Sequence, residues 1–379
     1  MTVRILDDVS VSPLTQAACA FPVACRLQDG GLLCAYRRGT AKHSRDAVFL
    51  VQRSMDDGRT WGDPVCVFDG MRGEAPESVH AGAVGEAPGG PVLALFTAVE
   101  ATRPEAYIFS EAGRELAHKF YVARSEDGGR TWLPPESHHI PGAPPLAYIN
   151  SRPLPLDNGD LLVPLEITTA ENLQASGVAR YESSTGVFRP LVICAKDAGL
   201  SYGDPKLARL SDGRILMLLW TFVNASEQTI SAHACISADE GRTWSAPRPT
   251  GVVSQIMTPH SLGDRRLIAA GNIRIPPEGI RLSCSENSGD TWETEYPVQM
   301  WDAREEKMLG VTLGSPGLPS ADGKKIWSEL PGFSFGTPDL IAGSGETLLL
   351  TYYTVIKGRV GVRACRFEVD FPTDEEPKL

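Results

Sequence analysis

An eight-residue motif with the pattern S-x-[DN]-x-G-x-T-W occurs four times in this chain, and this recurrence limits the possible folds more than any other feature. The copies cover residues 54–61, 125–132, 237–244 and 285–292. Each copy follows a short strand-like run, such as residues 47–53, and precedes another short run. We therefore expect each copy to form the turn of a β-hairpin.

The residue types of the motif suit a tight turn. A short Asp or Asn side chain accepts hydrogen bonds from backbone N–H groups of its own turn, Gly supplies a positive φ, and the Ser and Thr hydroxyls bond the remaining groups. Burying the closing Trp removes roughly 150–250 Å² from water. At about 25 cal/mol per Å², this is worth on the order of several kcal/mol as an upper bound. We interpret the motif as scaffold and not as a catalytic site.

The motif belongs to a longer unit that repeats six times. The third unit carries a degenerate copy over residues 182–188, and the sixth carries none. Units of this length with about four short strands each are typical of a β-propeller. The units begin near Phe21, His80, Ser151, Gly203, Thr258 and Thr337. The predicted fold is all-β, a six-bladed β-propeller of four-stranded antiparallel blades, with the motifs in the hairpins between the third and fourth strands.

The two ends of the chain have different predicted roles. The early run over residues 3–6 is suited to be the outer strand of the sixth blade, which would leave no open sheet edge. We therefore predict one domain over residues 1–370. Residues 371–379, which include two adjacent glutamates and a proline, are predicted to be a disordered tail.

Composition excludes several classes of partner. The net charge is −11 and there is no run of Lys and Arg, so we expect neither nucleic acid nor an anionic membrane as a partner. The eight cysteines form no C-x-x-C pair or Cys/His cluster, which indicates buried free thiols and gives no basis for a metal or other cofactor. The first residues lack the features of a signal peptide, which predicts a cytoplasmic protein. The composition specifies no oligomeric state.

The repeated motifs, together with the x-L-x-x-x-G-x-L-L pattern of the units, resemble the sialidase superfamily, also called the neuraminidase, BNR or Asp-box repeat superfamily. The resemblance covers nearly the whole chain. It implies that the motifs, called Asp boxes in that family, lie on the face away from the active site, and that substrate enters a funnel lined by the starts of the inner strands. It also implies three arginines around a substrate carboxylate, an Asp acid/base, and a Tyr nucleophile assisted by Glu.

Several positions of this chain match that pattern. Arg37 or Arg38, at the end of a second strand, corresponds to a pocket arginine that could bind a carboxylate by bidentate hydrogen bonds. Asp46 or His43, in the following loop, corresponds to the acid/base, and burial would raise the pKa of Asp46 as a general acid requires. Asp204 precedes a proline where the family has Glu-Pro, and we expect it to be the partner carboxylate.

Other candidates come from the remaining inner strands. Arg152 and Arg274 are predicted to complete the carboxylate-binding set, while His80 and His260 lie near inner-strand starts. Histidines there could act as acid/base groups in a lyase or an unconventional hydrolase.

The sequence also departs from the family pattern. Phe21 and Pro22 stand where the first arginine is expected, Trp220 aligns with another arginine, and Thr337 stands at the nucleophile position. Tyr352 or Tyr353, on the next strand, is a candidate replacement for the tyrosine.

The resemblance predicts an exo-glycosidase that hydrolyses a terminal acidic sugar, with sialic acid or a related nonulosonic or uronic acid as the first candidates. Two alternatives remain open. The same propeller could carry a polysaccharide lyase or a non-sialidase hydrolase that uses His80 or His260, or it could bind carbohydrate without catalysis.

Overall fold

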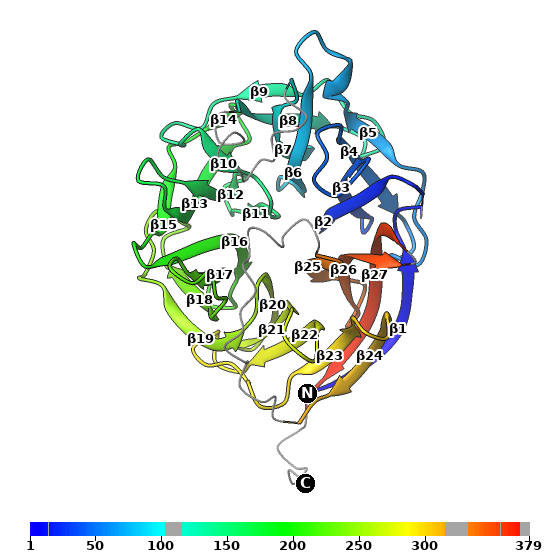
Figure 1. The fold of residues 1–379 in the computed structure, drawn as a ribbon, viewed down its shortest axis with the longest axis vertical. Coiled ribbons are helices and arrows are strands. Elements are labelled where there is room, and N and C mark those ends of the chain that lie inside the picture. Colours follow the sequence, from blue (N-terminus) through cyan, green and yellow to red (C-terminus); the bar gives the residue numbers. More distant parts are fainter. Residues whose placement is uncertain (14, 103–115, 315–332, 357, 372–379) are drawn as a thin grey trace.

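Six β-sheets are arranged around a central axis (Figure 1), as the repeats predict. The computed structural model describes residues 1–13, 15–102, 116–314, 333–356 and 358–371. In this part of the chain four sheets have four strands, one has five and one has six, and all strand pairs are antiparallel. The predicted all-β six-bladed propeller is confirmed.

The first three blades follow the chain from the axis outward. Blade 1 contains β2 (Ala18–Arg26), β3 (Leu32–Gly39), β4 (Val48–Ser54) and β5 (Val65–Phe68). Blade 2 follows a short 3₁₀ helix (Gly70–Arg72) and contains β6 (Glu77–Glu86), β7 (Val92–Glu100), β8 (His118–Ser125) and β9 (Glu136–His138). Blade 3 contains β10 (Leu146–Tyr148), β11 (Leu154–Pro155), β12 (Leu161–Thr168), β13 (Gln174–Glu182), β14 (Val187–Phe188) and β15 (Val192–Ala195). Its inner strand is thus divided into two short pieces that both pair with β12.

The last three blades complete the ring. Blade 4 contains β16 (Leu200–Arg209), β17 (Ile215–Val223), β18 (Ser231–Ser237) and β19 (Arg248–Val253). Blade 5 contains β20 (Met257–Gly263), β21 (Arg266–Ile273), β22 (Gly279–Ser285), β23 (Val298–Asp302) and β24 (Lys307–Thr312). Blade 6 contains β25 (Phe335–Ala342), β26 (Leu348–Ile356), β27 (Arg359–Asp370) and, at its outer edge, β1 (Thr2–Ser10).

Apolar side chains fill the spaces between neighbouring blades. In the described part of the chain, a buried apolar cluster lies at each of the six interfaces between neighbouring sheets. The second strand of a blade is therefore apolar on both faces; in β17, every residue except Val223 is buried. Seven of the eight cysteines are buried and all eight are free, in agreement with the interpretation of these residues as core thiols.

The four octapeptides all adopt the same hydrogen-bonded turn, and each lies between the third and fourth strands of its blade. In the first copy Asp56 accepts hydrogen bonds from the backbone N–H and the hydroxyl of Thr60, and the Ser54 hydroxyl accepts one from the backbone of Gly58. The Gly58 φ is +86°. Trp61 packs into the cluster between blades 6 and 1. The predicted turn chemistry is therefore present, and the Trp covers a seam between two blades.

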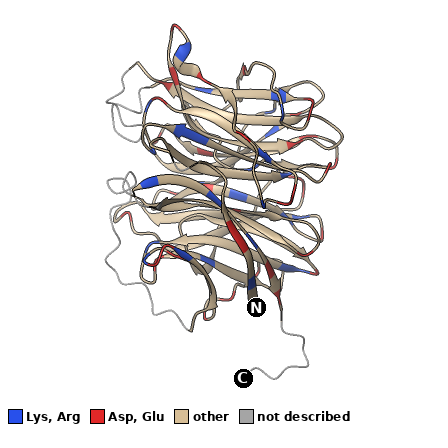
Figure 2. Cartoon of the chain, turned by 90° about the vertical axis from the view of Figure 1, so that its right-hand side faces the viewer, with Lys and Arg blue, Asp and Glu red and all other residues tan. Residues whose placement is uncertain are grey.

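The N-terminal strand β1 pairs along its length with β27, from Thr2 opposite Asp370 to Ser10 opposite Arg363. The last sheet thus contains both ends of the domain. The tail predicted for residues 371–379 lies outside the described residues except for Phe371. On the side of the ring seen in Figure 2, basic and acidic residues are interspersed. Among the described residues, no helix is long and apolar enough to cross a membrane.

Candidate active site

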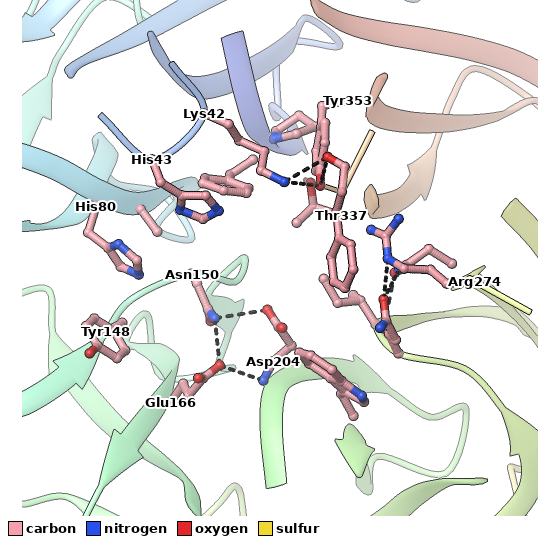
Figure 3. A pocket seen from close by; sticks show the side chains of 18 residues that line it. Lys42, His43, His80, Tyr148, Asn150, Glu166, Asp204, Arg274, Thr337 and Tyr353 are labelled. Atoms are coloured by element: carbon pink, nitrogen blue, oxygen red, sulfur yellow. Dashed lines mark hydrogen bonds between the residues drawn. The ribbon is translucent and has the colours of Figure 1, made fainter. Parts of the chain in front are cut away.

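A pocket lies on the axis at the face where the inner strands begin (Figure 3). Every blade contributes side chains to it. The lining residues are Phe21, Pro22, Lys42, His43, His80, Ala81, Tyr148, Asn150, Glu166, Asp204, Trp220, Gln255, Ile256, Asn272, Arg274, Phe333, Thr337 and Tyr353. The octapeptide turns follow the ends of strands that run parallel to the inner strands, so these turns lie at the opposite face.

Three inner strands turn a side chain into this pocket by the same local device. Phe21, Asp204 and Thr337 each precede a proline and have positive φ values of 59°, 46° and 45°. The ladder with the second strand shifts at each of these positions, which marks a β-bulge. A positive φ in a non-glycine residue is strained, and such strain concentrates at functional sites. The bulges therefore support a functional role for this mouth.

Glu166 and Asp204 form a carboxyl pair on one wall of the pocket. The amide Nδ2 of Asn150 donates to Asp204 Oδ1 at 3.0 Å and to Glu166 Oε2 at 3.3 Å, and the backbone N–H of Asp204 donates to the same Glu166 oxygen at 3.0 Å. Gln174 donates to the other oxygen of Glu166. Burial and the charge of Asp204 raise the pKa of Glu166 to about 7, and burial also raises the pKa of Asp204. Near neutral pH, the pair therefore retains a proton.

Two cations lie on another part of the pocket wall, beside Tyr353. Lys42 Nζ donates to the carbonyl of Phe333 at 2.7 Å and lies 3.4 Å from the hydroxyl of Tyr353. Burial and the charge of Arg274 lower the pKa of Lys42 to about 7. Arg274 donates to Gln255 at 2.7 Å, and its guanidinium carbon lies 3.8 Å from the ring centre of Phe333. This wall presents positive charge in a desolvated setting.

A row of imidazole and aromatic rings forms a further wall. The His43 ring lies 5.3 Å from Phe21, and the His80 ring lies 4.6 Å from Tyr148. Burial and the neighbouring positive charges, including that of Arg37, hold the pKa values of His43 and His80 well below the usual range. Both imidazoles are therefore neutral at physiological pH.

Five of the residues that the sequence suggested are brought together in this pocket: His43, His80, Asp204, Arg274 and Tyr353. Asp46 is not among the lining residues. Its carboxylate accepts hydrogen bonds from the backbone and hydroxyl of Thr40, and although burial raises its pKa, hydrogen bonds from Ser44 and Thr40 leave the pKa lowered overall. This turn-capping arrangement differs from the buried acid that the sequence suggested.

The structure places the two arginines of β3 outside the pocket lining. Arg37 is buried and donates to the carbonyl of Ser44 at 2.6 Å, so the backbone of the β3–β4 loop covers it. Burial lowers its pKa to about 10. Arg38 is exposed, near the end of β3.

Arg152 and His260 lie at the opposite mouth of the axis, where they line a second cavity of about 510 Å³. Arg152 crosses the axis to pair with Asp339 at 3.1 Å and donates to the carbonyls of Ala24 and Leu340. The position of Arg152 in the sequence resembles that of a pocket residue, but its side chain lines the cavity at the other end of the axis. Depth along the propeller axis separates Arg152 and His260 from the pocket.

Sequence reasoning did not single out Lys42, Glu166, Asn150 or Tyr148. The signal available for Glu166 was a carboxylate within an otherwise apolar strand, since its neighbours in β12 are mostly buried apolar residues. Lys42 precedes His43 in the same loop but matches no family position. Of the two tyrosines considered as nucleophiles, Tyr353 lines the pocket, whereas the hydroxyl of Tyr352 lies 3.3 Å from Asp8 near the outer strand.

Comparisons with known proteins agree with this architecture. Residues 30–304 match the family model described as BNR repeat-like domain, and no curated protein matches the chain. A protein of unknown function from Dyadobacter fermentans is 18% identical, with a TM-score of 0.71 over 97% of this chain and 100% of that one.

Two sialidases share the fold at lower identity. The Hadza microbial sialidase Hz136 is 14% identical, with a TM-score of 0.67 over 92% of this chain and 65% of its own. The Trypanosoma rangeli sialidase in complex with the inhibitor DANA is 12% identical, with a TM-score of 0.62 over 92% of this chain and 55% of its own. This chain thus spans less than two thirds of either sialidase. The chain is a six-bladed propeller structurally similar to sialidases, and it belongs to the BNR repeat-like domain family.

Proposed function

We propose that this protein is a glycoside hydrolase that removes a terminal acidic sugar, such as sialic acid or a related nonulosonic or uronic acid. One observation carries the proposal: a single axial pocket contains both a proton-retaining carboxyl pair, Glu166 and Asp204, and two desolvated cations, Lys42 and Arg274. Hydrolysis of an acidic glycoside needs a group of each kind, one to protonate the leaving oxygen and one to hold the substrate carboxylate.

Lys42 and Arg274 are suited to hold the carboxylate. Hydrogen bonds between a cation and a carboxylate are roughly twice as strong as neutral ones, and a desolvated site strengthens them further. The Arg274 guanidinium carbon lies 3.8 Å from the ring centre of Phe333 and 4.4 Å from that of Phe335, so two aromatic contacts hold this group. The T. rangeli sialidase, which shares the fold, binds the inhibitor DANA, and this supports an acidic sugar as the ligand class.

The carboxyl pair is suited to act as the acid. Its proton passes to the glycosidic oxygen as the bond from that oxygen to the anomeric carbon breaks, and the pair recovers a proton from the water that completes hydrolysis. Tyr353 is the candidate nucleophile, because it is the pocket tyrosine that lies beside both cations. Burial raises its pKa overall, although Arg274 acts to lower it, so the free phenol carries its proton. As the phenol oxygen bonds to the anomeric carbon, its proton passes to the carboxylate of the pair, and the tyrosine takes a proton back when water displaces it.

The test is release of the fluorophore from a panel of acidic aryl glycosides by the wild type and by Asp204→Asn, Glu166→Gln and Tyr353→Phe. We expect wild-type turnover of at least one acidic glycoside. Each carboxyl variant should lower kcat/KM by roughly 10²-fold or more, the usual contribution of general acid catalysis.

Matched controls lie on exposed turns of the opposite face. Asp212 is exposed and accepts hydrogen bonds from Arg214, and Glu126 is an exposed residue of the second octapeptide. Asp212→Asn and Glu126→Gln should retain wild-type kcat/KM. If D204N and E166Q turn over the substrate as fast as these controls, the assignment of the acid is overturned; if the wild type hydrolyses no acidic glycoside, the proposed activity is overturned.

A lyase acting on an acidic polysaccharide is the second candidate, and the His80–Tyr148 contact favours it. Proton abstraction beside a carboxylate requires a neutral base near a cation, and His80 is held neutral in the same pocket as Lys42 and Arg274. A rise in ultraviolet absorbance from an unsaturated uronate product, lost in His80→Ala, would replace the hydrolase assignment with this one.

A further inference from the structure

Lys206 lies directly behind the carboxyl pair and does not line the pocket. It follows Asp204 by two residues on the inner strand β16, and its side chain is buried. Its Nζ donates to the carbonyl oxygen of Asn150 at 3.1 Å. A buried lysine in this position needs a compensating negative charge, because burial of an unpaired charge is strongly unfavourable.

Asn150 connects Lys206 to both carboxyls. While its carbonyl accepts from Lys206, its side-chain Nδ2 donates to Asp204 Oδ1 and to Glu166 Oε2. A loss of the ammonium group therefore changes the pair in two ways, by removing a nearby positive charge and by releasing the residue that bridges the two carboxyls.

The charged groups that act on Lys206 come from three blades. The pKa of Lys206 is lowered overall, chiefly by burial and also by the positive charge of Arg152. The negative charges of Asp204, Asp339 and Glu166 act in the opposite direction. Arg152 forms an ion pair with Asp339 at 3.1 Å. Lys206 in turn lowers the pKa of Asp204 against the effect of burial. The positive charge of Lys206 thus acts on the Glu166–Asp204 pair.

We propose that Lys206 is a positioning residue that maintains one negative charge on the Glu166–Asp204 pair, so that the pair holds one proton and not two. This inference rests on the proposed hydrolase function of the pair. Two buried carboxyls without a cation would both be neutral over a wider pH range, because each is desolvated. A doubly protonated pair can donate a proton to the leaving oxygen but lacks the carboxylate that accepts the phenol proton of Tyr353 when that residue attacks.

The experiment compares Lys206→Met with Lys206→Arg through the pH dependence of kcat/KM on the acidic aryl glycoside that the wild type turns over. Removal of the positive charge raises the first macroscopic pKa of the pair, so the acid limb of the K206M profile should move up by about one unit, a tenfold loss of kcat/KM on that limb. K206R retains the charge and should keep the wild-type limb. Lys206→Gln is the second neutral variant if K206M does not fold.

A purely structural role predicts a different result, namely a lower thermal midpoint with an unmoved acid limb. An acid limb of K206M or K206Q that coincides with that of the wild type, or a limb that moves equally in K206R, overturns the proposal.

A second readout does not depend on turnover. Carbon-13 NMR titration of the side-chain carboxyls, with the Asp204 and Glu166 resonances assigned from D204N and E166Q, should show the pair titrating at higher pH in K206M than in the wild type. This shift without any glycoside turnover would support the role of Lys206 while overturning the proposed function. Unchanged titration with normal turnover would overturn the role of Lys206 and support the proposed function.

Discussion

Individual residues decide the charge of the pocket, and Lys42 has the most direct influence near neutral pH. Its ammonium is buried, interacts with the rings of Phe333 and Tyr353, and has a pKa lowered to about 7. A lysine with a depressed pKa is charged below that pKa and neutral above it. The positive charge of the pocket therefore decreases as the pH rises through about 7, leaving Arg274 as the remaining cation of that wall.

Substitution of Lys42 by arginine should reduce this pH dependence. In the wild type, we expect KM for an acidic aryl glycoside to rise by about tenfold between roughly pH 6 and 8, because a charge-assisted hydrogen bond worth about 1.5–3 kcal/mol is lost. In Lys42→Arg, the rise in KM should be smaller, since arginine stays protonated throughout and the titration of Glu166 remains. KM values measured across this range check the prediction, with a neutral aryl glycoside as the control substrate. Parallel curves for the two proteins would show that another group titrates.

Single elements join neighbouring blades, and the octapeptide turn is the clearest example. The glycine at the positive-φ position of each turn packs against a leucine from the second strand of the preceding blade. The four pairs are Gly58 with Leu349, Gly129 with Leu33, Gly241 with Leu162, and Gly289 with Leu216. Each tryptophan packs at the same interface. The repeated turn thus fixes both the hairpin of its own blade and the contact with the preceding blade.

Gly58→Ala should destabilise the protein more than Gly213→Ala. Both glycines have a φ of +86°, so both variants incur the left-handed backbone cost of about 1 kcal/mol. A Cβ at Gly58 would lie 2.9 Å from Leu349 Cδ1, whereas a Cβ at Gly213 would meet no atom within 4 Å. Overpacking adds roughly 1–3 kcal/mol. Urea unfolding of the two variants measures the difference, and equal losses of unfolding free energy would show that the interface leucine adjusts without cost.

At the scale of the whole molecule, the ring is closed by charge as well as by strand pairing. Arg366 of β27 is buried and forms ion pairs with Asp7 of β1 at 2.7 Å and with Asp57 of the first octapeptide at 3.3 Å. It therefore joins the N-terminal strand, the last blade and the first blade. A second pair between the same two strands, Arg4 with Glu368, lies at the surface.

Arg366→Met should lower the free energy of unfolding by about 3 kcal/mol, because the buried Asp57 carboxylate and the partly exposed Asp7 carboxylate both lose an ion-pair partner. Arg4→Met is the matched control on the same strand pair. Its side chain is 68% exposed, and the loss should be below about 1 kcal/mol. Thermal and urea unfolding provide the measurement. A small loss for R366M would show that Arg26, which also pairs with Asp57, compensates.

The amino-acid sequence by itself determined the architecture. Six repeat units, four of them with a turn whose bonds lie within eight residues, specify hairpins through local chemistry, and apolar strands specify a ring of packed sheets. Short-range hydrogen bonds and strand periodicity can be read along a chain because both partners are close in the sequence. This is why the turn, the blade count and the buried cysteines agree with the structure, while the fifth strand of blade 5 and the divided inner strand of blade 3 have no repeated signal.

Only the tertiary structure decided which side chains meet at the axis. Glu166, Asn150 and Asp204 come from two blades, and Lys42 and Tyr353 from the first and the last. Their proximity depends on ring closure and on one-residue bulges that reverse the direction of a side chain. A strand pattern determines the two faces of a blade but not the depth of a side chain along the propeller axis, and Arg152 lies at the mouth opposite the pocket. The charges of the site arise from burial and mutual proximity, and these exist only after the blades have packed.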